Sequence, residues 1–216
     1  AIDGQPCDPF EPVRRSFPIG PGARFDVIVD LPREEGAEAR LILRGNKDEA
    51  AGDRDILLLH SVGVARPPLP PVTSLRLNAE LPAEINLQSA RRVEVALDGL
   101  AAGTTASTPE AAWTSDAAAA GLGTKPLFTV KRKAPVVLGL SNKSTNAHAV
   151  YLHGHVMRLL HDLDDGWEPY WRDTAIVEPG RTHHIAFVAD NPGKWLLECS
   201  VMRNPAAGIS AWFAVT

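Results

Sequence analysis

The side chains best suited to metal or acid–base chemistry fall in two short segments of this 216-residue chain. The first segment, residues 148–155, reads HAVYLHGH and holds three histidines. The second segment, residues 195–200, reads WLLECS and places Glu198 beside Cys199. Neutral imidazole and cysteine thiolate are ligands for transition metals, so the two segments indicate a candidate metal site.

The same residues also fit other interpretations. His153 and His155 are two positions apart, so on a strand they share one face and can form a two-imidazole metal clip. Glu198 together with Tyr151 fits acid–base chemistry, and the alternative is a hydrogen-bonded structural group. A cysteine in a strand is usually a small buried hydrophobic residue, and core or interface histidines need no metal. For each of these residues we favour the structural role.

Short apolar stretches separated by glycine, proline and charged residues run through the whole chain and predict strands joined by turns. The expected strands are Arg24–Leu31, Ala39–Leu43, Asp55–His60, Arg92–Leu97, Leu127–Val130, Val136–Leu140, Ala149–Leu152, His155–Leu160, His184–Val188, Trp195–Cys199 and Ala211–Val215. Many short strands with turns between them predict an all-β sandwich of Greek-key type. The alanine-rich residues 109–121 are expected to hold a helical turn or a long loop.

A proline-dense segment, RPPLPP at residues 66–71, divides the chain. Proline cannot donate to a strand ladder and favours an extended spacer. We therefore expect the C-terminal part of one β-domain over residues 1–64, a linker over 65–74 and a complete sandwich over 75–216. Residues 1–64 supply too few strands for a closed domain, so we expect chain preceding Ala1, or another polypeptide, to cover their apolar face.

Composition limits the classes of partner. The chain has 44% hydrophobic and 22% charged residues, which argues against disorder. Its formal net charge is −4 and its longest basic run is residues 131–133, so we expect no nucleic-acid partner. No apolar run approaches the roughly 20 residues that span a bilayer, so we expect no membrane span. Nothing in the sequence supports a disulfide between Cys7 and Cys199.

The two histidine- and cysteine-bearing segments resemble the multicopper oxidase family. Residues 148–155 are similar to its His-Pro-x-His-Leu-His-Gly-His motif. Residues 195–200 fall where these enzymes carry Trp-x-x-His-Cys-His. Between them, WRDT, EPG and ADNPGKW follow in the family's order and spacing.

The beginning of the chain carries the same resemblance. DGQP at residues 3–6 and PGARFD at 21–26 are similar to the end of the family's second cupredoxin domain. The resemblance therefore covers nearly the whole chain. It implies a cupredoxin-like Greek-key sandwich over residues 75–216, preceded by part of a second cupredoxin-like domain.

In that family the third domain holds a type 1 copper, bound by one cysteine thiolate and two imidazoles with a weak axial thioether. The resemblance gives two of these positions to His148 and Cys199. Asn204 stands at the position of the second imidazole, and Ile209 stands at the axial methionine. An apolar axial residue is tolerable, but an amide is a poor copper donor, so we expect two strong ligands where three are needed.

The family's third domain also supplies ligands to a trinuclear copper cluster. These four positions fall on Tyr151, His153, Glu198 and Ser200, so His153 alone keeps an imidazole. The remaining cluster ligands of the family belong to a first domain. We therefore expect no catalytic residue in this chain, and copper at low occupancy or none.

The resemblance implies a multicopper-oxidase-like protein of the cell envelope, periplasmic or secreted, with most copper ligands lost and a binding or scaffolding role. The alternative is a divergent oxygen-using copper oxidase that retains a partial type 1 site. In both cases the expected partner is the missing N-terminal cupredoxin domain or domains, on the same protein or on another chain.

Three further features have structural interpretations. The acidic and aromatic residues 161–171 form either a recognition surface or, as we favour, a hairpin whose tryptophans cover the end of the sandwich. His183 and His184 point to opposite faces of a strand, and we expect both to be solvated. Asp173 is expected to hold strand backbone or a histidine in place.

Overall fold

The computed structural model describes residues 1–45, 52–97, 125–161, 166–201 and 204–216, with the backbone alone for 200–201 and 204–210. The chain divides into two compact units, one formed by residues 1–26 with 74–216 and the other by residues 27–73. The division groups residues 1–26 with the C-terminal sandwich, while the domain limits drawn from the sequence stay predictions. The alanine-rich residues 109–121 lie outside the described residues.

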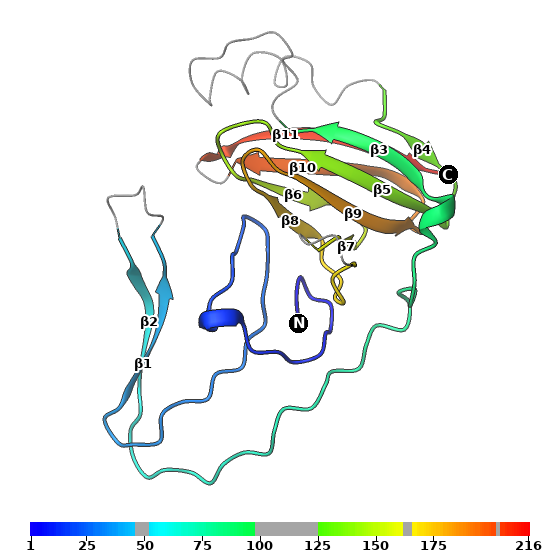
Figure 1. Ribbon diagram of the computed structural model, residues 1–216. Coiled ribbons are helices and arrows are strands. Elements are labelled where there is room, and N and C mark those ends of the chain that lie inside the picture. The colour runs from blue at the N-terminus through cyan, green and yellow to red at the C-terminus, as the bar shows by residue number, and fades with distance from the viewer. Residues whose placement is uncertain (46–51, 98–124, 162–165, 202–203) are drawn as a thin grey trace. The chain divides into compact units, whose positions relative to one another are not determined.

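The larger unit is a sandwich of two sheets (Figure 1). The first sheet has the strand order β4-β11-β10-β6-β8, with β4 (Thr129–Val130), β6 (His148–Leu152), β8 (Thr174–Val177), β10 (Gly193–Val201) and β11 (Asn204–Val215). The second has the order β3-β5-β9-β7, with β3 (Arg91–Ala96), β5 (Ala134–Ser141), β7 (Arg158–Leu159) and β9 (Thr182–Ala189). The prediction of an all-β sandwich is confirmed.

Most neighbouring strands are antiparallel, but β3 pairs with β5 in parallel and β11 pairs with β4 in parallel. Two short 3-10 turns complete the unit, η1 (Val13–Arg15) and η2 (Leu87–Ser89). In the part of the chain that the structure describes, no helix is long and apolar enough to cross a membrane.

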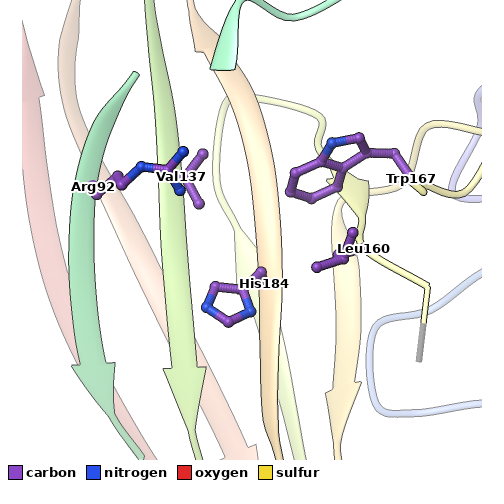
Figure 2. Close-up of a pocket in the computed structure, with 5 residues that line it drawn as sticks. All are labelled: Arg92, Val137, Leu160, Trp167 and His184. Carbon is purple, nitrogen blue, oxygen red and sulfur yellow. The ribbon is translucent and has the colours of Figure 1, made fainter. Parts of the chain in front are cut away.

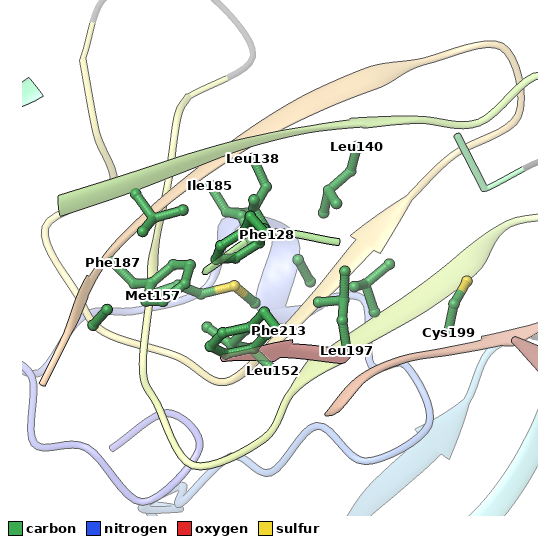
Figure 3. Packing of buried hydrophobic residues seen from close by; sticks show 14 of the residues in the cluster. Phe128, Leu138, Leu140, Leu152, Met157, Ile185, Phe187, Leu197, Cys199 and Phe213 are labelled. Carbon is green, nitrogen blue, oxygen red and sulfur yellow. The ribbon is translucent and has the colours of Figure 1, made fainter. Parts of the chain in front are cut away.

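The core lies between the two sheets because alternate side chains of each strand point inward. From the second sheet, β5 and β9 contribute Val136, Leu138, Leu140, Ile185 and Phe187, all fully buried. They meet inward-facing side chains of the first sheet, among them Phe213, whose ring centroid lies 5.7 Å from that of Phe187 (Figure 3). Each fully buried large side chain stabilises the fold by roughly 1.5–3 kcal/mol. This core therefore holds β6 and β10, the strands that carry His148 and Cys199, in place.

The smaller unit contains one antiparallel pair, β1 (Glu38–Leu43) and β2 (Arg54–His60), with Glu38 opposite His60. Apolar side chains along both strands are exposed, including Leu41, Ile42, Ile56 and Leu57. A two-stranded ribbon cannot bury such side chains by itself. Its completion by preceding chain or by another polypeptide stays a prediction.

The prediction of a strand over Arg24–Leu31 was wrong. Phe25 forms only an isolated bridge with Ile2, and residues 26–31 belong to no strand. The alternation of apolar residues gives the pattern of a strand, but a strand also needs a partner for its backbone groups. Conversely, β8 was not predicted, because its four residues are too short to give a pattern of their own.

Candidate metal centre

The imidazole of His148 and the thiol of Cys199 meet inside the sandwich. Their strands β6 and β10 are paired with Cys199 opposite Val150, and His148 Nδ1 lies 3.0 Å from Cys199 Sγ. Both residues are buried. Two ligands of one copper must lie close together, so the resemblance predicts this closeness, and the prediction is confirmed. Their role as metal ligands stays a prediction.

A network of hydrogen bonds continues from this pair. Burial raises the pKa of Cys199 to about 12, so at neutral pH the group is a thiol that can donate to His148 Nδ1. His148 Nε2 lies 2.8 Å from the Ser144 hydroxyl, which lies 2.7 Å from Asn142 Oδ1. The buried Asn142 donates in turn to the carbonyls of Asn146 and Val177. The pair is therefore part of a continuous hydrogen-bond network.

This pair fits a metal ion only in part. With metal–sulfur and metal–nitrogen lengths of about 2.3 and 2.0 Å, two tetrahedral ligands stand about 3.5 Å apart, so the pair must separate by roughly half an ångström. Ile209 stands opposite Cys199, and Asn204 opposite Val201, in the β10–β11 register. Neither an amide nor an alkyl side chain supplies the second imidazole that a type 1 copper needs.

Three of the four positions that resemble trinuclear ligands, Tyr151, His153 and Glu198, contact one another. Glu198 stands opposite Tyr151 in the β10–β6 register, and its Oε2 lies 3.0 Å from His153 Nε2. The Tyr151 ring lies edge-on to the His153 ring, with centroids 4.3 Å apart. His153 therefore has a carboxylate partner at the ring nitrogen remote from the backbone. This is the hydrogen-bonded group that we favoured over an acid–base pair of Glu198 and Tyr151.

His153 and His155 do not come together as a clip. His155 lies in the aromatic core, with ring centroids 5.3 Å from Phe187 and 5.7 Å from Trp195. Its Nε2 accepts the backbone N–H of Asn191 at 3.4 Å. Burial lowers the pKa of His155, which favours its neutral form. The two histidines sit in and after the turn that ends β6, so the strand alternation behind the clip does not apply.

Asp173 has a structural role, but its partner is an arginine near the start of the chain. Arg24 donates to Asp173 Oδ2 at 2.6 Å, and the Thr174 hydroxyl lies 3.0 Å from Asp173 Oδ1. The buried carboxylate of Asp3 accepts the backbone N–H groups of Arg24, Asp173 and Thr174 at 2.8, 3.0 and 3.0 Å. Burial raises the pKa of Asp173, and the Arg24 guanidinium opposes that shift. These bonds attach residues 1–26 to β8.

The expectation that His183 is solvated was wrong. Its side chain is buried, and its Nε2 lies 2.8 Å from Glu178 Oε2. His183 shares its face of β9 with Ile185 and Phe187, so the strand alternation places it inside. His184 lies on the outer face and is partly exposed.

Within residues 161–171, Trp171 covers the sandwich as we favoured, while Trp167 is partly exposed. Trp171 is buried, and the Arg158 guanidinium carbon lies 4.9 Å from its ring centroid. Residues 162–165 of this loop are outside the described part of the chain. Among the described residues, no three His, Cys, Asp or Glu side chains gather closely enough to hold a metal ion.

Two facing sheets with a buried His–Cys pair on neighbouring strands define a cupredoxin-like domain. A family profile described as multicopper oxidase matches residues 93–216, more than half of the chain. The chain belongs to the multicopper oxidase family.

Individual relatives agree with this membership. The chain is 28% identical over 101 residues to the iron multicopper oxidase fer1 of Mycosarcoma maydis, covering 40% of this chain and 16% of that protein. It is 31% identical over 87 residues to the multicopper oxidase MmcO of Mycobacterium tuberculosis, covering 40% of this chain and 17% of that protein. The multi-copper oxidase of Pseudomonas thermotolerans is similar with a TM-score of 0.75 and 26% identity, covering 100% of this chain and 48% of that chain.

Proposed function

We propose that this chain is the C-terminal portion of a multicopper-oxidase-type protein that acts by binding or scaffolding rather than by reducing oxygen. The observation that best supports this proposal is that side chains at positions resembling copper ligands form hydrogen bonds with one another. His148 bonds to Cys199, and His153 bonds to Glu198. The His148–Cys199 pair is buried, so its contact satisfies polar groups that would otherwise be costly to bury. The His153–Glu198 pair is partly exposed.

The chemistry of the donor set supports this proposal. The family binds copper, and a type 1 copper supplies one-electron transfer when bound. At the family's positions this chain offers His148 and Cys199 for that ion, with Asn204 in place of an imidazole. At the cluster positions a phenol, a carboxylate and a hydroxyl replace three imidazoles. Such a donor set fits a trinuclear copper cluster poorly.

The proposed partner is the remainder of the same architecture. The chain spans 48% of the related Pseudomonas protein, which is consistent with further cupredoxin domains in the whole protein or on another chain. The exposed apolar side chains of β1 and β2 fit a surface that such a domain covers. We further propose a cell-envelope location, periplasmic or secreted, by analogy with the family.

Oxygen uptake tests the proposal. The protein, together with the partner cupredoxin domains proposed above where they exist, is loaded with copper and freed of unbound metal. An oxygen electrode then follows uptake with a phenolic donor and, separately, with ferrous iron. We expect uptake no faster than in a sample without protein. Copper-dependent turnover that is lost in Cys199→Ser would refute the proposal.

The second candidate is a divergent copper oxidase with a partial type 1 site. One observation favours it: the ring nitrogen of His148 that faces Cys199 Sγ is Nδ1, and Nε2 is occupied by Ser144. β6 and β10 therefore each present one donor atom, His148 Nδ1 and Cys199 Sγ, to a common point. This candidate requires the Cys199-dependent turnover that the first excludes, so the same experiment separates them.

A further inference from the structure

An open pocket of about 210 Å³ lies on the outer face of the β3-β5-β9-β7 sheet (Figure 2). Its lining residues are Arg92, Val137, Leu160, Trp167 and His184. None of them stands at a position that resembles a copper ligand. The pocket is therefore separate from the candidate metal centre.

Strand alternation places these side chains on one face. Val93 and Val95 of β3 pack against the core, so Arg92 points outward. The register puts Arg92 opposite Val137, and Val137 opposite Ala186. Val137 is only 3% exposed although it faces outward. Figure 2 shows the Arg92 guanidinium lying beside Val137, so this arginine forms one wall of the pocket.

The opposite wall is fixed by backbone bonds. Leu160 donates its N–H to the carbonyl of His184 at 2.9 Å and forms a bridge with Trp167. The backbone N–H of Glu168 donates to the carbonyl of Leu159 at 2.7 Å. Trp167 is thus held beyond the sheet edge, with its indole on the far side of β9 from Arg92 (Figure 2). The Arg92 guanidinium lies beside β5 and the Trp167 indole lies beyond β9, while Val137 and Leu160 supply apolar lining and His184 projects from β9 (Figure 2).

We propose that this pocket binds a small planar aromatic monocarboxylate. The guanidinium of Arg92 matches a carboxylate in geometry and charge. Its bond to the Leu87 carbonyl, at 3.4 Å, uses one of the five N–H donors of the group. The Trp167 indole offers a face for the aromatic ring, and the His184 imidazole adds a hydrogen-bonding group. Ligand pockets usually measure roughly 300–1,000 Å³, so the smaller volume here suits a single ring.

The carboxylate of Glu94 lies near the pocket, so its charge also affects the affinity for an anionic ligand. Gly139 stands between Glu94 and His184 in the register. The Glu94 carboxylate lies over Gly139, in the space that a Cβ would occupy. Glu94 is two residues from Arg92 on the same face of β3, so its carboxylate repels an anion that approaches Arg92. Neutralising Glu94 and neutralising Arg92 should consequently change the affinity for a carboxylate in opposite directions.

Isothermal titration calorimetry with benzoate tests the proposal on the 216-residue chain. We expect a Kd on the order of 0.1–1 mM, as is usual for a small ligand in an open site. Arg92→Gln should weaken binding roughly tenfold, and Glu94→Gln should strengthen it about twofold or more. Benzamide, which lacks the charge, and cyclohexanecarboxylate, which lacks the aromatic ring, should each bind more weakly than benzoate.

Arg91→Gln is the matched control, because it removes the same charge from the adjacent residue on the other face of β3. It should leave the affinity within about twofold of the parent value. Trp167→Leu provides a second arm and should abolish detectable binding while the thermal unfolding temperature shows that the chain is folded. The proposal is overturned if benzoate does not bind, if benzamide binds as tightly, or if Arg92→Gln and Arg91→Gln behave alike.

Discussion

His148 Nδ1 lies 3.0 Å from Cys199 Sγ, although the two residues are 51 positions apart. The contact is made because β6 and β10 are paired and both side chains point into the sandwich. In the multicopper oxidase family these positions serve a type 1 copper. Here burial keeps Cys199 in its thiol form, so the two side chains bond to each other.

The buried thiol predicts a loss of stability in alkali. The pKa of Cys199 is raised from 9.0 to about 12, so the folded chain holds its proton where the unfolded chain loses it. The stabilising contribution is complete below pH 9 and is lost as the pH rises to about 12. Over that interval the difference amounts to about 4 kcal/mol.

Urea unfolding at several pH values between 8 and 11 measures this effect. The parent chain should lose stability with rising pH more steeply than Cys199→Ala, by up to about 1.4 kcal/mol per pH unit. Parallel pH profiles for the two proteins would show that Cys199 is not the group responsible.

A tight turn predicts a clear difference between two glycine substitutions. Gly154 has φ of +69°, and an added Cβ would overlap the ring of Trp195. Gly180 has φ of +72°, with nothing within 4 Å of an added Cβ. Gly154→Ala should therefore cost about 3 kcal/mol or more, from backbone strain and overpacking together. Gly180→Ala should cost only about 1–2 kcal/mol. Equal losses in chemical unfolding would contradict the packing of Trp195 on this turn.

The bonds around Asp3 predict that residues 1–26 are attached to the sandwich. Asp3→Ala leaves three backbone N–H groups without their carboxylate, so we expect a loss of about 2–4 kcal/mol. Limited proteolysis should then cut within residues 1–26 before the sandwich unfolds. Asp8→Ala, a substitution of an exposed carboxylate in the same segment, is the control and should leave both readouts unchanged. Cleavage at parent rates in Asp3→Ala would argue against this attachment.

The sequence allowed the class of fold and the main pair of residues to be predicted. Period-two alternation gave most strands of the sandwich, and motif spacing brought His148 and Cys199 together. The prediction of strands failed where a strand depends on a pairing partner that is distant in the sequence. Residues 26–31 have the alternation of a strand but pair with no described strand.

The burial of individual polar residues was equally hard to predict. His183 is buried because its face of β9 packs against the core. No local pattern shows which of the adjacent His183 and His184 faces inward. The bonds from Asp3 and Arg24 to Asp173, the residue before β8, span more than 140 positions. The pocket beside Trp167 needs four segments to form. Each of these features is set by tertiary packing.

An imidazole at position 204 and a thioether at position 209 should give a type 1 copper site. The β10–β11 register places Ile209 opposite Cys199 and Asn204 beside the end of β10. The double substitution Asn204→His and Ile209→Met should therefore give a copper-loaded protein with an intense absorption at about 600 nm from charge transfer between thiolate and copper. Ile209→Met alone, which leaves the amide in place, should not. A folded, colourless double variant would show that the backbone no longer has the geometry of a type 1 site.

The amount of copper that the unmodified protein retains tests the central claim most directly. After loading with copper and removal of weakly bound metal, elemental analysis gives the ratio of copper to protein. Two strong donors hold the metal poorly, so we expect well under one copper per chain, dependent on Cys199 and lost in Cys199→Ser. Three or more coppers per whole protein, with an intense band at about 600 nm, would contradict the account.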